Sequence, residues 1–315
     1  MEPMSTLIPR LWPFLSHSSS SVRKSTLVTL KTLTINSRVK EETNPDKLNS
    51  SAEDSNCDAL KCGDNFSFDS KNLKLNFGVI DWQWKLLQES LRHIFQRILV
   101  EANENIQNMA KEVWLNIIAN ADLGALLHAA CPFVSSWICL AMQPPRLPFD
   151  PSILIQASNL LPGDSNDTVT HRRRHRKLSD DLGGANPTTS LKLYLGGSES
   201  TPIEVREKNY VRARIIAAKV LGSLSHYLVQ PAPGVIYTPE TESPMDCYTK
   251  VLLGHLNSRS AVQRLVCGLI IAFWAKDDSS ICPGPTKLQE KLRQCVMEYV
   301  YYDEVAVSFT RYLFL

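Results

Sequence analysis

Apolar side chains recur every three or four residues along most of this chain, the spacing that places them on one face of an α-helix. The pattern is clear over residues 84–98, 104–120 and 201–229, and a helix over about 260–275 is apolar on nearly every side. No run that alternates between apolar and polar residues is long enough for a convincing strand. The sequence therefore predicts an all-α protein.

Capping signals predict where several of these helices begin. Thr201-Pro202-Ile203-Glu204 has the spacing of a capping box with proline at the first helical position, and Ser243 to Asp246 repeats the signal. Asp81 is the candidate cap for the helix that follows it. On the helix after Thr201 we expect a wide inner face made of two stripes. They are Val211, Ile215 and Ala218, and then Ile216, Val220 and Leu224.

Residues 123–145 contain no acid or base, a length that would span a bilayer. Pro132 lies in the middle of this stretch, with polar side chains on both sides of it. Because proline breaks a helix, two buried helices that meet at Pro132 explain the pattern better than a membrane span. We expect no membrane association.

The amino-terminal end allows two interpretations. Many Ser and Thr residues and a single acid, Glu2, within residues 1–40 are typical of a transit peptide. Two apolar stripes on either side of the polar turn at Ser18 to Ser21 indicate instead a pair of packed helices, which we favour. The stripes are Leu7, Leu11, Phe14 and Leu15, and then Val22, Leu27, Leu30 and Leu33.

Composition divides the chain into helical blocks and polar connections. A HEAT-like helix pair at 1–35 precedes a disordered linker at 36–78, which has too few large aliphatic residues to offset the entropy of ordering. Helical repeats follow at 79–157, ending in a short helix that begins at Asp150-Pro151, and again at 201–315. Residues 158–200 between them are rich in glycine, proline and bases, and predict a second disordered insertion.

A faint internal repeat organises the helical blocks. In each copy a helix ends, a short polar turn follows, and the next helix opens with a β-branched residue and a base. The copies lie around residues 14–24, 255–264 and, less clearly, 301–311. This layout is typical of HEAT repeats of about 40 residues, which stack into a solenoid because one helix pair cannot bury both of its faces. A generic helical bundle is the alternative.

Charge, cysteine content and missing motifs exclude several functions. The 315 residues include 34 Lys+Arg and 32 Asp+Glu, so the chain as a whole has no strong attraction for nucleic acid or anionic lipid. Eight cysteines are too sparse for a disulfide framework, and Cys131, Cys139 and Cys267 lie in apolar runs where a thiol packs as a small hydrophobe. The sequence has no phosphate-binding glycine loop and no nucleophile elbow. We expect neither catalysis nor a cofactor on this chain.

The sharpest local feature is a basic run inside the second insertion. Its five fixed charges belong to Arg172, Arg173, Arg174, Arg176 and Lys177. Such a run is typical of a nuclear-import signal, which binds in an acidic groove of an import receptor. A solvated basic loop and a weak contact to nucleic acid are the other two readings of the same residues.

Two further candidates lie beside the run. His171 and His175 are four residues apart, as metal ligands on a helix would be, but the arginines between them oppose a bound dication. Ser179 follows Arg176 by three residues, a common context for basic-directed kinases. A phosphate on Ser179 would neutralise part of the neighbouring charge and weaken whatever the run binds.

Four stretches resemble one family. They are Ala129-Ala130-Cys131-Pro132-Phe133 with Trp137 to Pro144, Leu147-Pro148 and Asp150; Arg212-Ala213-Arg214 with Ala217 to Gly222; His255 to Ser258 with Gln263-Arg264; and Tyr301 to Val307 with Phe309-Thr310-Arg311. In this order they are similar to the central region of the TATA-binding-protein-associated Swi/Snf-type ATPases, which remove TATA-binding protein from DNA. The resemblance covers most of residues 80–311, and residues 5–35 resemble a preceding HEAT repeat.

The resemblance implies a transcription regulator in the nucleus, whose HEAT-repeat arm grips TATA-binding protein while a carboxy-terminal ATPase, using ATP and Mg, removes that protein from DNA. This sequence lacks the motor motifs and the amino-terminal repeats of the family. We therefore expect a non-catalytic scaffold segment, as a fragment or truncated isoform, that reaches DNA only indirectly. A HEAT adaptor for import or trafficking is the alternative. The resemblance assigns no individual contact residue to this chain.

Overall fold

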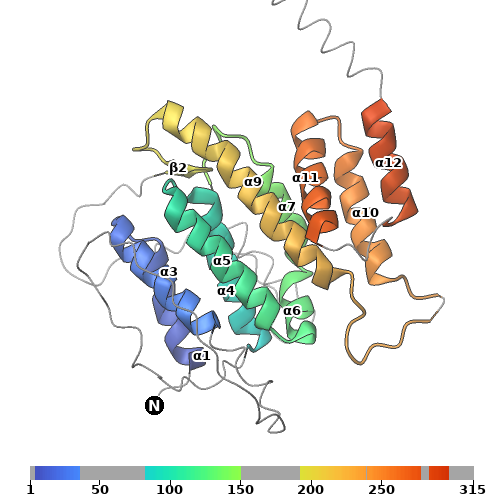
Figure 1. Ribbon diagram of the computed structural model, residues 1–315, viewed down its shortest axis with the longest axis horizontal. Coiled ribbons are helices and arrows are strands. Elements are labelled where there is room, and N and C mark those ends of the chain that lie inside the picture. Colours follow the sequence, from blue (N-terminus) through green and yellow to red (C-terminus); the bar gives the residue numbers. More distant parts are fainter. Residues whose placement is uncertain (1–3, 36–81, 150–191, 239, 278–283, 298–315) are drawn as a thin grey trace, which may run out of the picture.

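The computed structural model describes residues 4–35, 82–149, 192–238, 240–277 and 284–297 (Figure 1). These residues are mostly helical, which confirms the all-α prediction. The helical elements are α1 (Met4–Leu7), η1 (Ile8–Leu11), α2 (Trp12–Leu15), α3 (Ser20–Ile35), α4 (Trp84–Val100), α5 (Glu104–Asn120), α6 (Leu123–Ala130), α7 (Val134–Ala141), α9 (Ile203–Leu228), α10 (Pro244–Leu256), α11 (Ala261–Asp277) and α12 (Thr286–Met297). The strands β1 (Leu193–Tyr194) and β2 (Gly197–Ser198) pair as an antiparallel hairpin.

The helices stack in two layers, as HEAT repeats do (Figure 1). One layer contains α3, α5, α9 and α11, each packed against the next. On the other side, α2 contacts α4, α4 contacts α6, and α10 contacts α12. Each helix pair therefore covers one face of its neighbour, and a single hydrophobic core runs from Ile8 to Leu288.

The turn between α2 and α3 is closed by a defined set of hydrogen bonds. The backbone N–H of Ser19 donates to His17 Nδ1 over 3.0 Å. Arg23 Nη1 donates to the carbonyl oxygens of His17 and Ser18 over 2.9 and 2.8 Å. The arginine thus satisfies carbonyls that the end of α2 leaves without a helical partner.

The turn between α10 and α11 is closed in the same way. The backbone N–H of Ser260 donates to Ser258 Oγ over 3.1 Å, and Arg264 Nη1 donates to the carbonyl oxygen of Ser258 over 2.8 Å. Arg264 follows Ser258 by the same number of residues as Arg23 follows His17. The predicted repeat is therefore confirmed for these two copies, while the copy at 301–311 lies outside the described residues.

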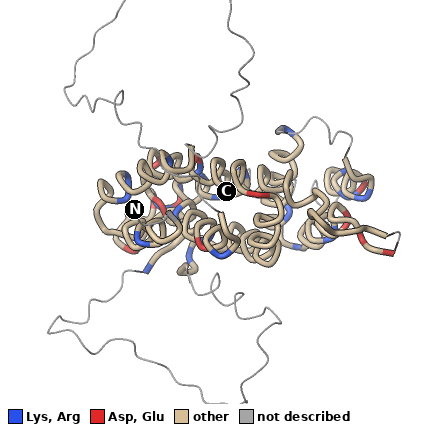
Figure 2. The backbone as a smooth tube through the Cα atoms, turned by 90° about the horizontal axis from the view of Figure 1, so that it is seen from below, with Lys and Arg blue, Asp and Glu red and all other residues tan. Residues whose placement is uncertain are grey.

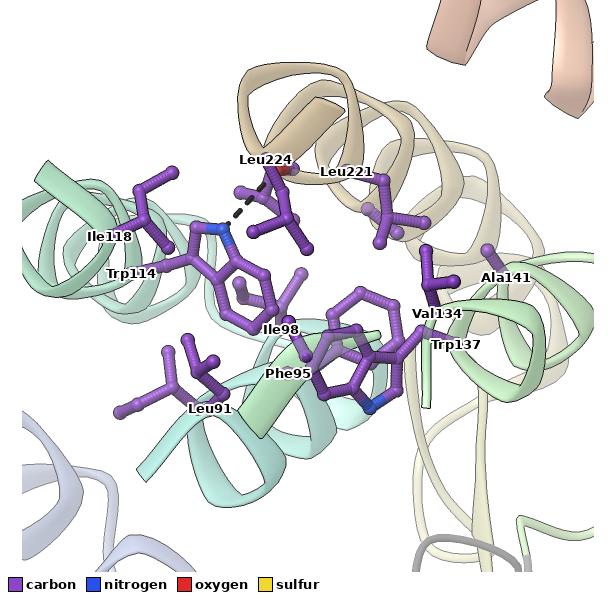
Figure 3. Packing of buried hydrophobic residues seen from close by; sticks show 14 of the residues in the cluster. Leu91, Phe95, Ile98, Trp114, Ile118, Val134, Trp137, Ala141, Leu221 and Leu224 are labelled. Carbon is purple, nitrogen blue, oxygen red and sulfur yellow. Dashed lines mark hydrogen bonds between the residues drawn. The ribbon is translucent and has the colours of Figure 1, made fainter. Parts of the chain in front are cut away.

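Three aromatic side chains form the centre of the core where four helices meet (Figure 3). Phe95 of α4, Trp114 of α5 and Trp137 of α7 have ring centroids 5.5–5.8 Å apart. Trp114 Nε1 also donates to the carbonyl oxygen of Val220 on α9 over 3.2 Å, so the polar end of this buried ring has a partner. This cluster joins α4 and α5 to α7 and α9.

The uncharged stretch contains two helices, as predicted. α6 and α7 are separated at Pro132 and bury Leu126, Trp137 and Ile138. Among the described helices, none alone is long and apolar enough to cross a membrane, and α6 with α7 meets that test only as a pair bent by 58°.

Two predicted apolar faces are wrong in part. On α9, Val211 and Ile215 are 54% and 43% exposed, whereas Ala218 and the second stripe are buried. The reason is that α11 makes its close approach near Gly222, well beyond Ile215 along the helix. In the first repeat the chain forms three short helical pieces, so Ile8 and Trp12 are buried while Phe14 is 47% exposed.

Of the three predicted helix caps, one is confirmed, one is wrong and one lies outside the described residues. Ser243 caps α10, because its hydroxyl accepts from the Asp246 N–H over 3.1 Å. The capping box at Thr201 is wrong, because the Thr201 hydroxyl accepts from the Ser198 N–H instead and Pro202 precedes α9 without a side-chain cap. Gln83 precedes α4, and Asp81 lies outside the described residues.

The cysteine prediction holds for one of its three residues. Cys267 is buried, and its Sγ lies 3.4 Å from the carbonyl oxygen of Leu252. Cys131 and Cys139 are exposed, because α6 and α7 turn their alanine, leucine and tryptophan side chains toward the core and leave these thiols on the outer side.

A buried ion-pair cluster fastens α2 and α3 to α4 and to the turn that follows α4. Glu101, directly after α4, is fully buried and contacts Arg23 Nε at 2.9 Å and Arg97 Nε at 3.1 Å. Arg97 also donates to the carbonyl oxygen of Leu15 over 2.8 Å. Burial alone raises the pKa of Glu101, but the hydrogen bond from Arg23 and the charge of Arg97 outweigh it and hold the pKa below its usual range.

We expect Glu101→Gln to destabilise the chain strongly, because it leaves two largely buried guanidinium groups without their anion. The expected loss is about 3 kcal/mol in the free energy of unfolding, measured by urea denaturation at neutral pH. The control is Glu112→Gln, which removes the surface pair with Lys31 at 2.6 Å and costs at most about 1 kcal/mol. Because the pKa of Glu101 is lowered in the folded chain, its contribution to the free energy of unfolding is lost as the pH falls through that folded-state pKa. The stabilities of the parent chain and of Glu101→Gln should therefore converge at acidic pH. Equal losses for the two variants at neutral pH would contradict the role of Glu101.

Candidate functional site

The basic run predicted as an import signal lies outside the described residues, as do His171, His175 and Ser179. The described residues on either side of it do meet. The Phe149 N–H donates to the carbonyl oxygen of Leu193 over 2.6 Å. Both ends of the segment that carries the run are therefore attached to the solenoid at one place.

The end of the predicted disordered insertion at 158–200 is ordered, so that prediction is wrong for residues 192–200. Leu195 at the tip of the hairpin is fully buried, and the Gly196 N–H donates to the carbonyl oxygen of Leu99 over 2.8 Å. Gly196 has a φ of 81°, and a Cβ there would lie 2.5 Å from the backbone nitrogen of Tyr210. Only glycine fits this position, which lets the hairpin dock between α4 and α9.

Arg212 and Arg214, from one of the family-like stretches, extend from α9 to two different neighbours. Arg212 donates to Gln107 Oε1 over 2.8 Å and to the carbonyl oxygen of Ala102 over 2.7 Å, at the turn between α4 and α5. Arg214 donates to the carbonyl oxygens of Ala141, Met142 and Gln143 over 2.8–3.1 Å, at the end of α7.

These contacts give the stretch a structural role. Ala213 between the two arginines is fully buried, and the Arg214 guanidinium lies 4.1 Å from the centroid of the Tyr210 ring. Burial lowers the pKa of Arg214, and Tyr210 opposes that shift. Because both arginines bind backbone carbonyls of the chain itself, they fix the position of α9 rather than present charge to a partner.

The position of α9 creates a hollow between it and α5. One turn before the hollow, the hydrogen bond from Trp114 to Val220 holds the two helices together. Toward their carboxyl ends they border an open hollow of about 370 Å³. Its walls are Leu115, Asn116, Ile118 and Ala119 from α5, and Ser223, His226 and Tyr227 from α9.

The wall of the hollow has no carboxylate, ammonium or guanidinium group and is mixed in polarity. It has aliphatic carbon from Leu115 and Ile118, and hydrogen-bonding groups from Asn116, Ser223 and Tyr227. Its described lining has no Asp, Glu, Lys, Arg or Cys and a single imidazole, that of His226, so it provides neither fixed positive charge for a phosphate nor the set of ligands that a metal ion needs. Apolar walls with a few amide and hydroxyl groups fit the side chains of another protein.

Charge is not concentrated on one face. Figure 2 shows Lys and Arg interspersed with Asp and Glu along the described part of the solenoid. Many of these side chains are already paired within the chain, as Lys31 is with Glu112 and Arg212 is with Glu104. The described surface is thus better suited to a protein than to a polyanion such as DNA.

Sequence reasoning missed the hollow, because no short motif encodes it. Its residues occur as ordinary helix positions on α5 and α9, more than a hundred residues apart in the sequence. A usable signal was the tryptophan at position 114, whose ring nitrogen needs a buried acceptor and so marks a junction between helices.

The stacked two-layer helix pairs define a HEAT-type helical-repeat protein. Residues 113–313 match the profile of the family described as "Domain of unknown function (DUF3535)", and the chain belongs to that family. It is 30% identical to human TATA-binding protein-associated factor 172 over 312 residues, which is 98% of this chain and 14% of that protein. It is 26% identical to Arabidopsis thaliana TATA-binding protein-associated factor BTAF1 over 293 residues, 90% of this chain and 12% of that protein. These matches confirm the family resemblance, and the chain spans only a small part of either relative.

We expect Gly222→Ala to disturb the position of α9. The added Cβ would lie 2.7 Å from Phe273 Cβ and 2.9 Å from the carbonyl oxygen of Ile270, so α9 and α11 must separate. Overpacking of this kind costs about 1–3 kcal/mol, measured by urea denaturation. Gly254→Ala on α10 is the matched control, because nothing lies within 4 Å of its Cβ, and it should gain about 0.5–1 kcal/mol from the better helix former. Two variants of equal stability would contradict the close packing at Gly222.

Proposed function

We propose that this chain is a non-catalytic HEAT scaffold segment of a nuclear transcription regulator, and that it binds TATA-binding protein. The carrying observation is the 30% identity to human TATA-binding protein-associated factor 172, which extends over 98% of this chain. The relatives' names refer to association with TATA-binding protein, and the fold of this chain is of the kind that binds proteins along a stacked helical surface.

In this proposal the hollow between α5 and α9 receives an apolar side chain of TATA-binding protein. Its aliphatic walls would bury that side chain, and Asn116 and Ser223 would lie beside the backbone of the partner. The chain itself contributes binding only. Any removal of TATA-binding protein from DNA would require an ATPase with ATP and Mg that this sequence does not encode, so contact with DNA is indirect.

The basic run would serve nuclear entry. Five bases from Arg172 to Lys177 suit the acidic groove of an import receptor. A phosphate on Ser179 would weaken that interaction. An adaptor for import or trafficking is the second candidate, and this same run is what favours it.

We expect immobilised TATA-binding protein to retain the purified chain, and Ala119→Gln to reduce that binding because the longer side chain fills the hollow. Ala272→Gln is the matched control, since Ala272 is an exposed alanine on α11 away from the hollow. The loss should be about tenfold or more in Kd, as for a filled pocket at an interface centre. Circular dichroism of each variant checks that the fold is kept.

The outcomes separate the proposals. Equal binding by both variants would place the contact elsewhere while leaving the scaffold role standing. Failure of the parent chain to bind TATA-binding protein, together with binding to an import receptor that is lost when the five bases are replaced, would favour the adaptor.

A further inference from the structure

The connection between α9 and α10 contains an ordered loop that projects from the edge of the solenoid (Figure 1). Ala232 to Val235 form a turn in which the Val235 N–H donates to the carbonyl oxygen of Ala232 over 3.2 Å. Gly234 has a φ of 76°, as the third position of a type II turn requires, and proline precedes it. The Tyr237 hydroxyl then accepts from the Ala232 N–H over 3.0 Å and closes the loop.

Thr238 follows this turn in an accessible position. Its side chain is exposed, and its Oγ1 lies 2.9 Å from Thr241 Oγ1. Ile236, two residues earlier, is 88% exposed, and residues 235–238 belong to no helix or strand. Pro239 follows Thr238 in the sequence. An enzyme that binds a short extended segment could therefore reach the hydroxyl without unfolding a helix.

The sequence contains three Ser/Thr-Pro dipeptides, and the structure distinguishes them. They begin at Thr201, Thr238 and Ser243. The Thr201 hydroxyl is held by the Ser198 N–H, with the hairpin on one side and the first turn of α9 on the other. The Ser243 hydroxyl caps α10 and donates to Asp246 Oδ2 over 2.7 Å, so extending its backbone would unwind the first turn of that helix. Thr238 also takes part in a turn, because its carbonyl oxygen accepts from the Thr241 N–H over 2.9 Å. That turn is exposed and belongs to neither a helix cap nor the hairpin, so opening it disturbs neither a helix nor a strand.

We propose that Thr238 is a phosphorylation site for a proline-directed Ser/Thr protein kinase. The γ-phosphoryl group of ATP would be transferred to Thr238 Oγ1. The new bond joins that oxygen to phosphorus, the bond between the γ-phosphorus and the β–γ bridging oxygen breaks, ADP leaves, and a base of the kinase accepts the hydroxyl proton. This assignment is independent of the function proposed above.

The phosphate would change the charge of one edge of the solenoid. Glu240 and Glu242 are exposed beside Thr238, and Glu242 is paired with Lys250 at 2.5 Å. A phosphothreonine adds about −1.5 to −2 charges at pH 7, and would make this acidic edge more attractive to basic partners and less so to acidic ones. The Thr238–Thr241 contact would be lost, but no helix-capping bond involves Thr238.

The test uses the full chain, a purified cyclin-dependent kinase and ATP, with phosphopeptides mapped by mass spectrometry. We expect phosphate on Thr238 of the folded chain and none on Thr201 or Ser243. Thr238→Val should lose the modification, and Thr241→Val, the control next to it, should keep it. Pro239→Ala should also lose it while the hydroxyl remains.

A heat-unfolded sample of the same chain shows whether the fold provides the selectivity. There Thr201 and Ser243 should be modified as well, because their turns no longer exist. Phosphate on Ser243 or Thr201 of the folded chain at a level equal to Thr238, or no phosphate on Thr238 under conditions that modify the unfolded chain, would overturn the assignment. Absence of phosphate from both samples would overturn it too.

Discussion

The contact of Trp114 with Phe95, Trp137 and the Val220 carbonyl is the interaction on which the rest of the structure depends. A HEAT pair exposes an apolar face on each side, so the array exists only where neighbouring pairs cover one another. At this junction four helices from two consecutive pairs share one aromatic cluster, and the indole N–H of Trp114 fixes α5 against α9. The residues that line the hollow follow Trp114 on α5 and Val220 on α9, so this contact sets how far apart the two helices lie at the hollow.

Arginines that donate to backbone carbonyls fix the turns and helix ends that apolar packing alone does not hold. Arg23 and Arg264 close equivalent turns, while Arg212 and Arg214 join α9 to the turns of earlier pairs. A carbonyl at a helix end has no hydrogen-bond partner within the helix. Apolar packing cannot supply one, whereas a charged guanidinium donates a strong hydrogen bond. The family-like stretch at residues 212–214 is therefore explained by the fold, without any contact to a partner.

The fold was largely predictable from the sequence, and the site was not. Periodicity located α4, α5, α9 and α11, and Pro132 located the break between α6 and α7, because these signals are local. The hairpin at 193–198 was missed because two-residue strands give no alternation, and its order comes from distant partners, Leu99 and Phe149. The exposure of Val211 and Ile215 was missed because helical periodicity cannot say how far along α9 its neighbour α11 reaches.

Among the described residues, the hollow and the exposed reactive groups lie on different kinds of element. The described lining of the hollow between α5 and α9 includes no Asp, Glu, Lys or Arg. The loop between α9 and α10 faces water and carries Glu240, Glu242 and the exposed hydroxyl of Thr238. The hollow is thus formed by helices, whereas this exposed hydroxyl and these carboxylates lie on a connection. Under the two proposals made above, a phosphate on this loop would change the charge of the edge while the helix packing that forms the hollow stays as it is.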